Sequence, residues 1–136
     1  LACHRSSVAK PTVGRWHASC ALGGMRTHLH QDIVEHAVQV ITIARPHVEA
    51  EPGGDRELGS QLRRALSSVP LNLAEGLGTA GGNARLRFET ARGSLGEARA
   101  AIRVAVAWGY LAEDATRALP ETLNVLGGRV FGLVRR

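Results

Sequence analysis

The chain is 136 residues long, which is the length of one ordinary domain and too short for two well-buried cores. Hydrophobic residues make up 44% of it but aromatic residues only 4%, so leucine, valine, isoleucine and alanine must fill the core. This composition favours packed helices over a β-sheet. No window approaches about 18 uninterrupted apolar residues, and the first residues lack the apolar run of a secretory signal. We therefore expect a cytoplasmic protein without a membrane span.

The formal net charge is +5, from 17 basic and 12 acidic residues, and a basic balance is typical of proteins with a nucleic-acid or other anionic partner. The first 24 residues contain three basic residues and no acid, so the rest carries 14 basic against 12 acidic residues, about +2. All the basic residues of that remainder are arginines, which suit bidentate contacts to phosphate or carboxylate, although a GC-rich genome would also explain them. The positions of the arginines therefore matter more than the total charge.

Residues 1–24 have neither helical nor strand periodicity and end directly before Met25, the only methionine. We interpret residues 1–24 as a disordered leader or a mis-assigned start, with a transit peptide as the alternative, and residues 25–136 as the folded domain. The only cysteines, Cys3 and Cys20, lie in this leader. Their spacing from the two histidines of the leader is poor for a zinc site, so we expect reduced thiols and no bound metal.

The next two segments carry apolar residues at helical spacing. The first covers residues 28–48 and ends before Pro52-Gly53-Gly54. The second begins after Asp55, which can cap it, and continues through Pro70, where we expect a kink. The apolar positions of the two segments are Ile33, Ala37, Ile41, Ala44, Val48, Leu58, Leu62, Ala65, Val69, Leu73 and Leu77.

A glycine-rich turn over residues 76–82 precedes a third helical segment, for which Asn83 is the candidate cap and Gly109 the stop. A fourth segment starts at about Asp114, and Gly127-Gly128 weakens its middle. The apolar positions of these segments are Phe88, Ala91, Leu95, Ala98, Ile102, Val106, Leu119, Leu123, Leu126, Val130 and Leu133. Four helices of roughly 20 residues joined by short turns predict an all-α, antiparallel, up-down-up-down four-helix bundle.

Two patterns resemble catalytic motifs without their context. The glycine spacing from Gly76 to Gly81 matches a dinucleotide-binding loop, but it follows a helix rather than a strand, so we interpret it as helix termination and turn. Glu75, Glu89 and Glu97 have no nucleophile with both a base and an orienting group at a recognisable spacing, and ion pairing with arginine explains them better. We expect no enzymatic activity, no catalytic residue and no cofactor.

The third segment carries the most informative polar pattern, a stripe of arginines. At about 100° per residue, its members fall within roughly 40° of each other and only Glu89 borders them. The members of the stripe are Arg85, Arg92, Arg99 and Arg103. Such a row can contact phosphates, with help from Arg63 or Arg64, or it can pair with acids of a neighbouring helix or subunit. Both interpretations stay open at this point.

Two further patterns lie beside the apolar faces. Polar residues flank the face of the second helix at Gln61, Arg64, Ser68, Asn72 and Glu75. Polar groups so close to a core are expected to form hydrogen bonds between helices. On the third helix, Leu86, Val104 and Trp108 lie opposite Phe88, so a single bundle would expose them and we expect a homo-oligomer.

The segments QLRRALSSVPLNLAEGLG (residues 61–78), RFETARGSLGEA (87–98) and WGYL (108–111) resemble the 23S rRNA intervening-sequence proteins. The resemblance covers about residues 30–134. Carried over by position, the motif residues are Arg63, Arg64, Pro70, Asn72, Glu75, Gly76, Arg92, Gly93 and Ser94. The chain departs from the family pattern at Thr79-Ala80-Gly81-Gly82, where many relatives carry basic residues.

The resemblance implies an antiparallel bundle that assembles as a homopentamer and has no enzymatic activity. Relatives in diversity-generating retroelements are basic accessory proteins that bind a reverse transcriptase and nucleic acid. Two classes of function therefore remain open for this chain. One is an accessory protein that contacts RNA or DNA, and the other is an oligomeric scaffold that contacts only proteins, with a reverse transcriptase as one possible partner.

Overall fold

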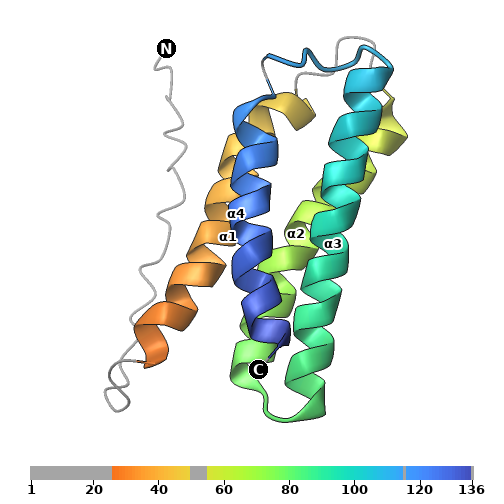
Figure 1. The fold of residues 1–136 in the computed structure, drawn as a ribbon. Coiled ribbons are helices and arrows are strands. Elements are labelled where there is room, and N and C mark those ends of the chain that lie inside the picture. Colours follow the sequence, from red (N-terminus) through yellow and green to blue (C-terminus); the bar gives the residue numbers. More distant parts are fainter. Residues whose placement is uncertain (1–25, 50–54, 115, 136) are drawn as a thin grey trace, which may run out of the picture.

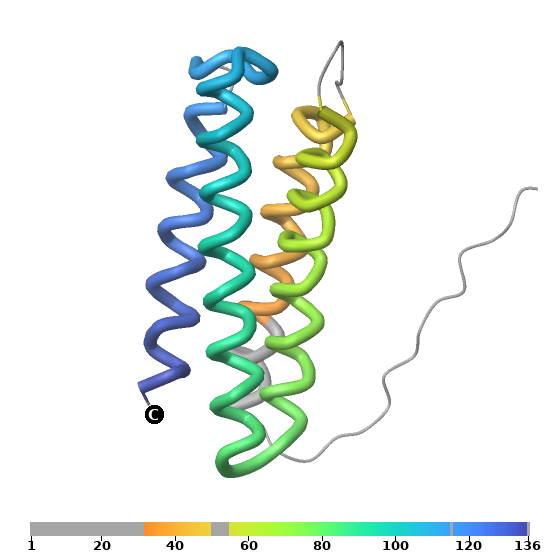
Figure 2. Tube along the Cα trace, turned by 90° about the vertical axis from the view of Figure 1, so that its right-hand side faces the viewer, coloured from red at the N-terminus to blue at the C-terminus, as the bar shows by residue number. Residues whose placement is uncertain are grey.

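The computed structural model describes residues 26–49, 55–114 and 116–135, and in these residues it contains four helices and no strand (Figure 1). The helices are α1 (Arg26–Glu49), α2 (Arg56–Gly78), α3 (Gly82–Ala107) and α4 (Ala118–Val134). Each helix packs against two neighbours, because α4 returns to α1 and closes the bundle. Figure 2 shows α3 beside α4 and α1 beside α2. The predicted all-α four-helix bundle is confirmed, whereas the leader predicted for residues 1–24 lies outside the described residues.

Small and aliphatic side chains fill the core, as the composition predicts. The buried alanines come from three of the helices and include Ala37, Ala44, Ala65, Ala91 and Ala98. Leucines from α2, α3 and α4 are the largest fully buried side chains, and Phe88 is the one aromatic side chain that is buried in the described part of the chain. Because alanine adds little bulk at a helix contact, the helices of this bundle can approach one another closely.

The start of α2 and its path through proline agree with the sequence prediction. The Asp55 carboxylate accepts hydrogen bonds from the backbone N–H groups of Glu57 and Leu58, at 2.9 and 3.4 Å, and so caps the helix. Pro70 is buried inside α2, and the helix continues to Gly78.

The turn between α2 and α3 is shorter than predicted, because Gly76 and Gly78 belong to α2. The predicted Asn83 cap is wrong. Gly81 occupies the cap position with a φ of 67°, a left-handed conformation that glycine adopts without steric cost, and α3 has already begun at Gly82. Asn83 therefore lies exposed in the first turn of α3.

The connection from α3 to α4 confirms the predicted stop and moves the predicted start. Gly109 has a φ of 76°, and the N–H group of Tyr110 donates to the carbonyl of Ala105 at 2.8 Å, which ends α3 in a glycine-dependent cap. The fourth helix begins at Ala118 rather than near Asp114. The reason is a separate turn, in which the buried hydroxyl of Thr116 donates to the carbonyl of Ala112 at 3.2 Å.

Gly76 lies at a close contact between α2 and α3. A Cβ atom built on Gly76 would lie 2.6 Å from Cε1 of Phe88 and 3.1 Å from Cβ of Arg87. Real Cβ atoms do not approach a ring carbon this closely, so the aromatic ring occupies space that only glycine leaves open.

We predict that Gly76→Ala lowers the free energy of unfolding by about 1 to 3 kcal/mol, because the added methyl group displaces the Phe88 ring from a packed core. Urea denaturation measures the change. Gly78→Ala is the matched control, since no heavy atom lies within 4 Å of its built Cβ atom and alanine favours the helix. Equal stability of Gly76→Ala and the wild type would contradict this account of the α2–α3 contact.

Candidate functional site

The arginines Arg85, Arg92, Arg99 and Arg103 all lie on α3, and we call this row the α3 stripe. It consists of three exposed arginines and one that is partly buried. Arg92 and Arg103 are exposed, and neither forms an ion pair with any residue that the structure describes. Arg85 is exposed too, and its Nε atom donates to Oε1 of Glu89 at 3.1 Å, one helical turn away. An exposed pair of this kind contributes only about 0 to 1 kcal/mol, so it does not remove Arg85 from contact with other anions.

Arg99 differs from the rest of the stripe because it is held at the contact between α3 and α4. Its Nη2 atom donates to the backbone carbonyl of Leu123 at 2.8 Å, while its buried Nε atom has no hydrogen-bond partner. A Cβ atom on Gly127 would collide with Nη2 of Arg99. The sequence predicts only that Gly127 weakens the helix. In the structure, Gly127 also makes room for the guanidinium group of Arg99.

Arg63 and Arg64 line two different grooves beside α2. Arg63 lines a groove of about 190 Å³ between α1 and α2, together with Arg45 and Glu49. Arg64 lines a groove of about 640 Å³ between α2 and α3, together with two acids and Gln61. The six arginines predicted to contact nucleic acid therefore do not form one surface, and only the α3 stripe is continuous.

The polar motif residues connect α2 to α3, as predicted for the polar flank of the second helix. The amide nitrogen of Asn72 donates to the carbonyl and the hydroxyl oxygen of Ser68, at 2.8 and 3.0 Å. The buried Ser94 hydroxyl then donates to the Ser68 hydroxyl at 2.8 Å, across the helix contact. The hydrogen bond between Ser68 and Ser94 stabilises the pairing of α2 and α3. Of the other motif residues, Pro70 is buried in α2 and Gly93 is exposed on α3.

Glu75 forms an ion pair with an arginine, as the sequence predicts, and its partner lies on α3. Its Oε1 atom lies 2.7 Å from Nη2 of Arg87 on α3, whereas Arg92 is exposed. Arg87 is neither a member of the α3 stripe nor one of the carried-over motif residues. The pairing with Arg87 leaves Arg92 available to an external anion.

The model of the 23S rRNA-intervening sequence protein family matches residues 28–131, which include α2, α3 and most of α1 and α4. The chain belongs to this family. No curated protein matches the sequence. None of the helices that the structure describes is both long and apolar enough to cross a membrane.

A long-range ion pair connects α4 to α1, and the sequence gives no sign of it. Nη2 of Arg129 donates to Oδ2 of Asp32 at 2.8 Å, and its Nη1 atom lies 3.0 Å from Nδ1 of His36. A guanidinium group has only donors, so Nδ1 of His36 acts as the acceptor. Asp32 and His36 are one turn apart on α1, but no local pattern indicates their partner, 97 and 93 residues further along the chain.

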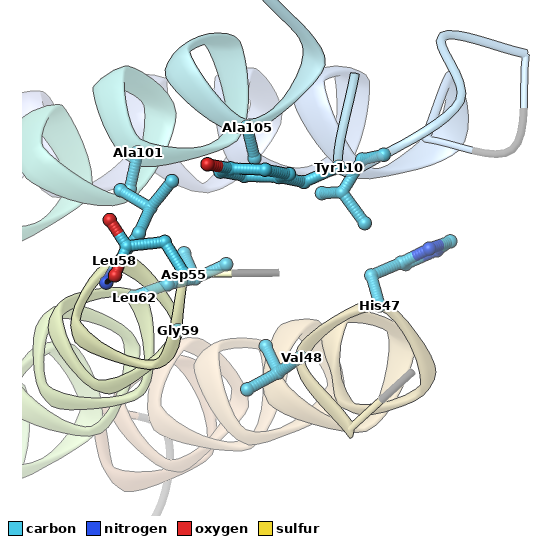
Figure 3. A pocket seen from close by; sticks show the side chains of 10 residues that line it. His47, Val48, Asp55, Leu58, Gly59, Leu62, Ala101, Ala105 and Tyr110 are labelled. Atoms are coloured by element: carbon cyan, nitrogen blue, oxygen red, sulfur yellow. Dashed lines mark hydrogen bonds between the residues drawn. The ribbon is translucent and has the colours of Figure 1, made fainter. Parts of the chain in front are cut away.

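The pocket at one end of the bundle is small. Figure 3 shows His47 and Val48 from α1 on one side and Ala105 and Tyr110 on the other, with the cap residue Asp55 beside them. The volume of about 40 Å³ holds water rather than an organic ligand, for which pockets of roughly 300 Å³ or more are usual. This pocket is therefore too small to be a candidate site for an organic ligand.

We predict that Gly127→Ala lowers the free energy of unfolding by about 1 to 2 kcal/mol relative to Gly128→Ala, because the new methyl group displaces Arg99 from the Leu123 carbonyl. Gly128 is the control, since nothing lies within 4 Å of its built Cβ atom and both changes gain the same helix propensity. In an Arg99→Ala background the difference between the two variants should disappear in urea denaturation. A difference that persists there would show that Gly127 acts through another contact.

Proposed function

We propose that this chain is a non-catalytic, oligomeric accessory protein that contacts nucleic acid in the cytoplasm and uses no cofactor. The observation that carries the proposal is the exposure of Arg92 and Arg103, which lack ion-pair partners among the described residues. Unpaired guanidinium groups at helical spacing can bind successive phosphates, each contact adding a salt-dependent contribution to affinity. The family description, which refers to an intervening sequence of 23S rRNA, agrees with a nucleic-acid context.

Exposed apolar side chains on α3 support the oligomeric part of the proposal. On α3, Leu86 is 58% exposed and Val104 43%, and Trp108, the residue directly after the helix, is 71% exposed. Large apolar groups at these exposures favour burial between copies. A pentameric ring, which the family resemblance implies, would repeat the α3 stripe five times and raise the local positive potential well above that of one subunit.

A purely protein-binding scaffold, with a reverse transcriptase as one possible partner, is the second candidate. The groove between α2 and α3 favours it, because Glu57, Glu97 and Arg64 bring both signs of charge beside the apolar side chain of Val104. Mixed charge beside an apolar strip is typical of a protein interface and unfavourable for a polyanion.

We predict that the wild type sediments with a mass several times that of one chain, and that five copies are present. Val104→Gln should weaken the assembly at micromolar concentration, because it places a polar side chain in the apolar contact. Val125→Gln on α4 is the control, since Val125 is also exposed and lies on a different helix. A monomeric wild type in sedimentation velocity would contradict the oligomer, and equal weakening by both variants would contradict the α3 interface.

We predict that the double variant Arg92→Gln, Arg103→Gln binds RNA more weakly and reduces the slope of log Kd against log salt by about one for each lost phosphate contact. Helicity should stay unchanged, because both side chains are exposed. Arg45→Gln, Arg56→Gln is the matched control, because it removes the same charge from exposed positions on α1 and α2. A wild type without salt-sensitive RNA retention at low ionic strength would leave the scaffold as the better function.

A further inference from the structure

The contact between Arg99 and α4 determines which α4 residues lie beside the α3 stripe. The Arg99–Leu123 hydrogen bond fixes the register of two helices that run in opposite directions (Figure 1). Phe131 follows Gly127 by four residues, so it lies on the side of α4 that faces Arg99. Arg92 precedes Arg99 by seven residues on the same side of α3. Since the helices are antiparallel, Phe131 and Arg92 lie on the same side of the Arg99 contact and at similar heights.

Phe131 is an exposed aromatic side chain within a basic surface. Its side chain is 45% exposed, and the guanidinium carbon of Arg135 lies 5.4 Å from the centre of its ring. We define the α3–α4 face as the α3 stripe together with Phe131 and Arg135. On α3, Glu89 is the acid that borders the stripe, and it already pairs with Arg85. An exposed aromatic ring therefore lies beside the guanidinium group of Arg135 on the side of α4 that faces the α3 stripe.

We propose that the α3–α4 face binds unpaired RNA, with the arginines on its phosphates and Phe131 stacked against a base. This proposal rests on the nucleic-acid function proposed above and adds to it the form of the ligand. Arginines alone attract paired and unpaired strands alike, whereas an exposed aromatic ring stacks only on a base whose face is open. RNA presents such bases in its loops and ends, and charge complementarity commits the face to it rather than to a protein.

The geometry of the face fits a short strand. The α3 stripe from Arg85 to Arg103 extends over about 27 Å at about 1.5 Å per residue, which suits the smallest single-strand sites of roughly four nucleotides. Arg99 is already held by α4 at the middle of the stripe, so it loses little side-chain freedom when a phosphate binds its remaining N–H groups. Phe131 lies beside one half of the stripe, where a base next to a bound phosphate can reach it.

The test uses the full chain and a fluorescein-labelled 12-nucleotide RNA without self-complementarity, alone or paired with its complement, in anisotropy titrations. Phe131→Leu should weaken binding of the single strand about ten-fold and that of the duplex less than about two-fold. The slope of log Kd against log salt should not change, because no charge is lost. Phe131→Tyr, which keeps the ring, should bind the single strand as the wild type does, and so should Val125→Ala, which shortens an exposed side chain elsewhere on α4.

The outcomes separate this proposal from the function on which it rests. A wild type that binds neither RNA contradicts both the nucleic-acid function and the α3–α4 face. In a second outcome, the wild type binds RNA in a salt-dependent way, but Phe131→Leu binds both RNAs unchanged or loses affinity equally for both. That outcome supports the nucleic-acid function and overturns the stacking site. Circular dichroism and urea denaturation of Phe131→Leu distinguish a lost contact from a lost fold.

Discussion

Close approach of the helices is the constraint on which the rest of this structure depends. A core built from alanine and leucine has few large side chains to hold helices together, so the backbones must come near enough for small groups to touch. Gly76 admits the ring of Phe88 between α2 and α3, and Gly127 admits the guanidinium group of Arg99 between α3 and α4. The Ser68–Ser94 hydrogen bond of 2.8 Å has the same requirement, since two short side chains can meet only across a narrow helix contact. Gly76, Gly127 and the Ser68–Ser94 pair therefore serve one purpose.

The fold could be predicted from the sequence because its signals are local and repeated. Each helix carries its own apolar period, and the capping aspartate before α2 and the glycine after α3 act within a few residues of the helix end. The prediction failed where backbone conformation decided the boundary. Asn83 has the right side chain for a cap, but the positive φ of Gly81 starts α3 earlier. Near Asp114, the hydrogen bonds of Thr116 form a separate turn before α4 begins.

The candidate site could be predicted only in part, because periodicity gives the side of a helix but not the neighbour on that side. The four arginines of the α3 stripe share one side of α3, but nothing local indicates that Arg99 would lie against α4 while Arg92 stays free. Glu75 pairs with Arg87, beside the close contact of Gly76 with Phe88, and no local pattern indicates which arginine of α3 it meets. Arg129 finds its partners on α1, which depends on how α4 closes the bundle.

The structure divides the arginines into two groups with different physical roles. Arg87, Arg99 and Arg129 each contact a group on another helix, so much of their capacity for hydrogen bonds stabilises helix pairing. Arg92 and Arg103 are exposed and form no ion pair in the described part of the chain, so both stay open to an external anion. Net charge does not distinguish the two groups, and a chain of modest charge can still present a strongly positive surface. The proposed ring would repeat the few free guanidinium groups, and its attraction for a polyanion would add over the subunits while the internal ion pairs cancel.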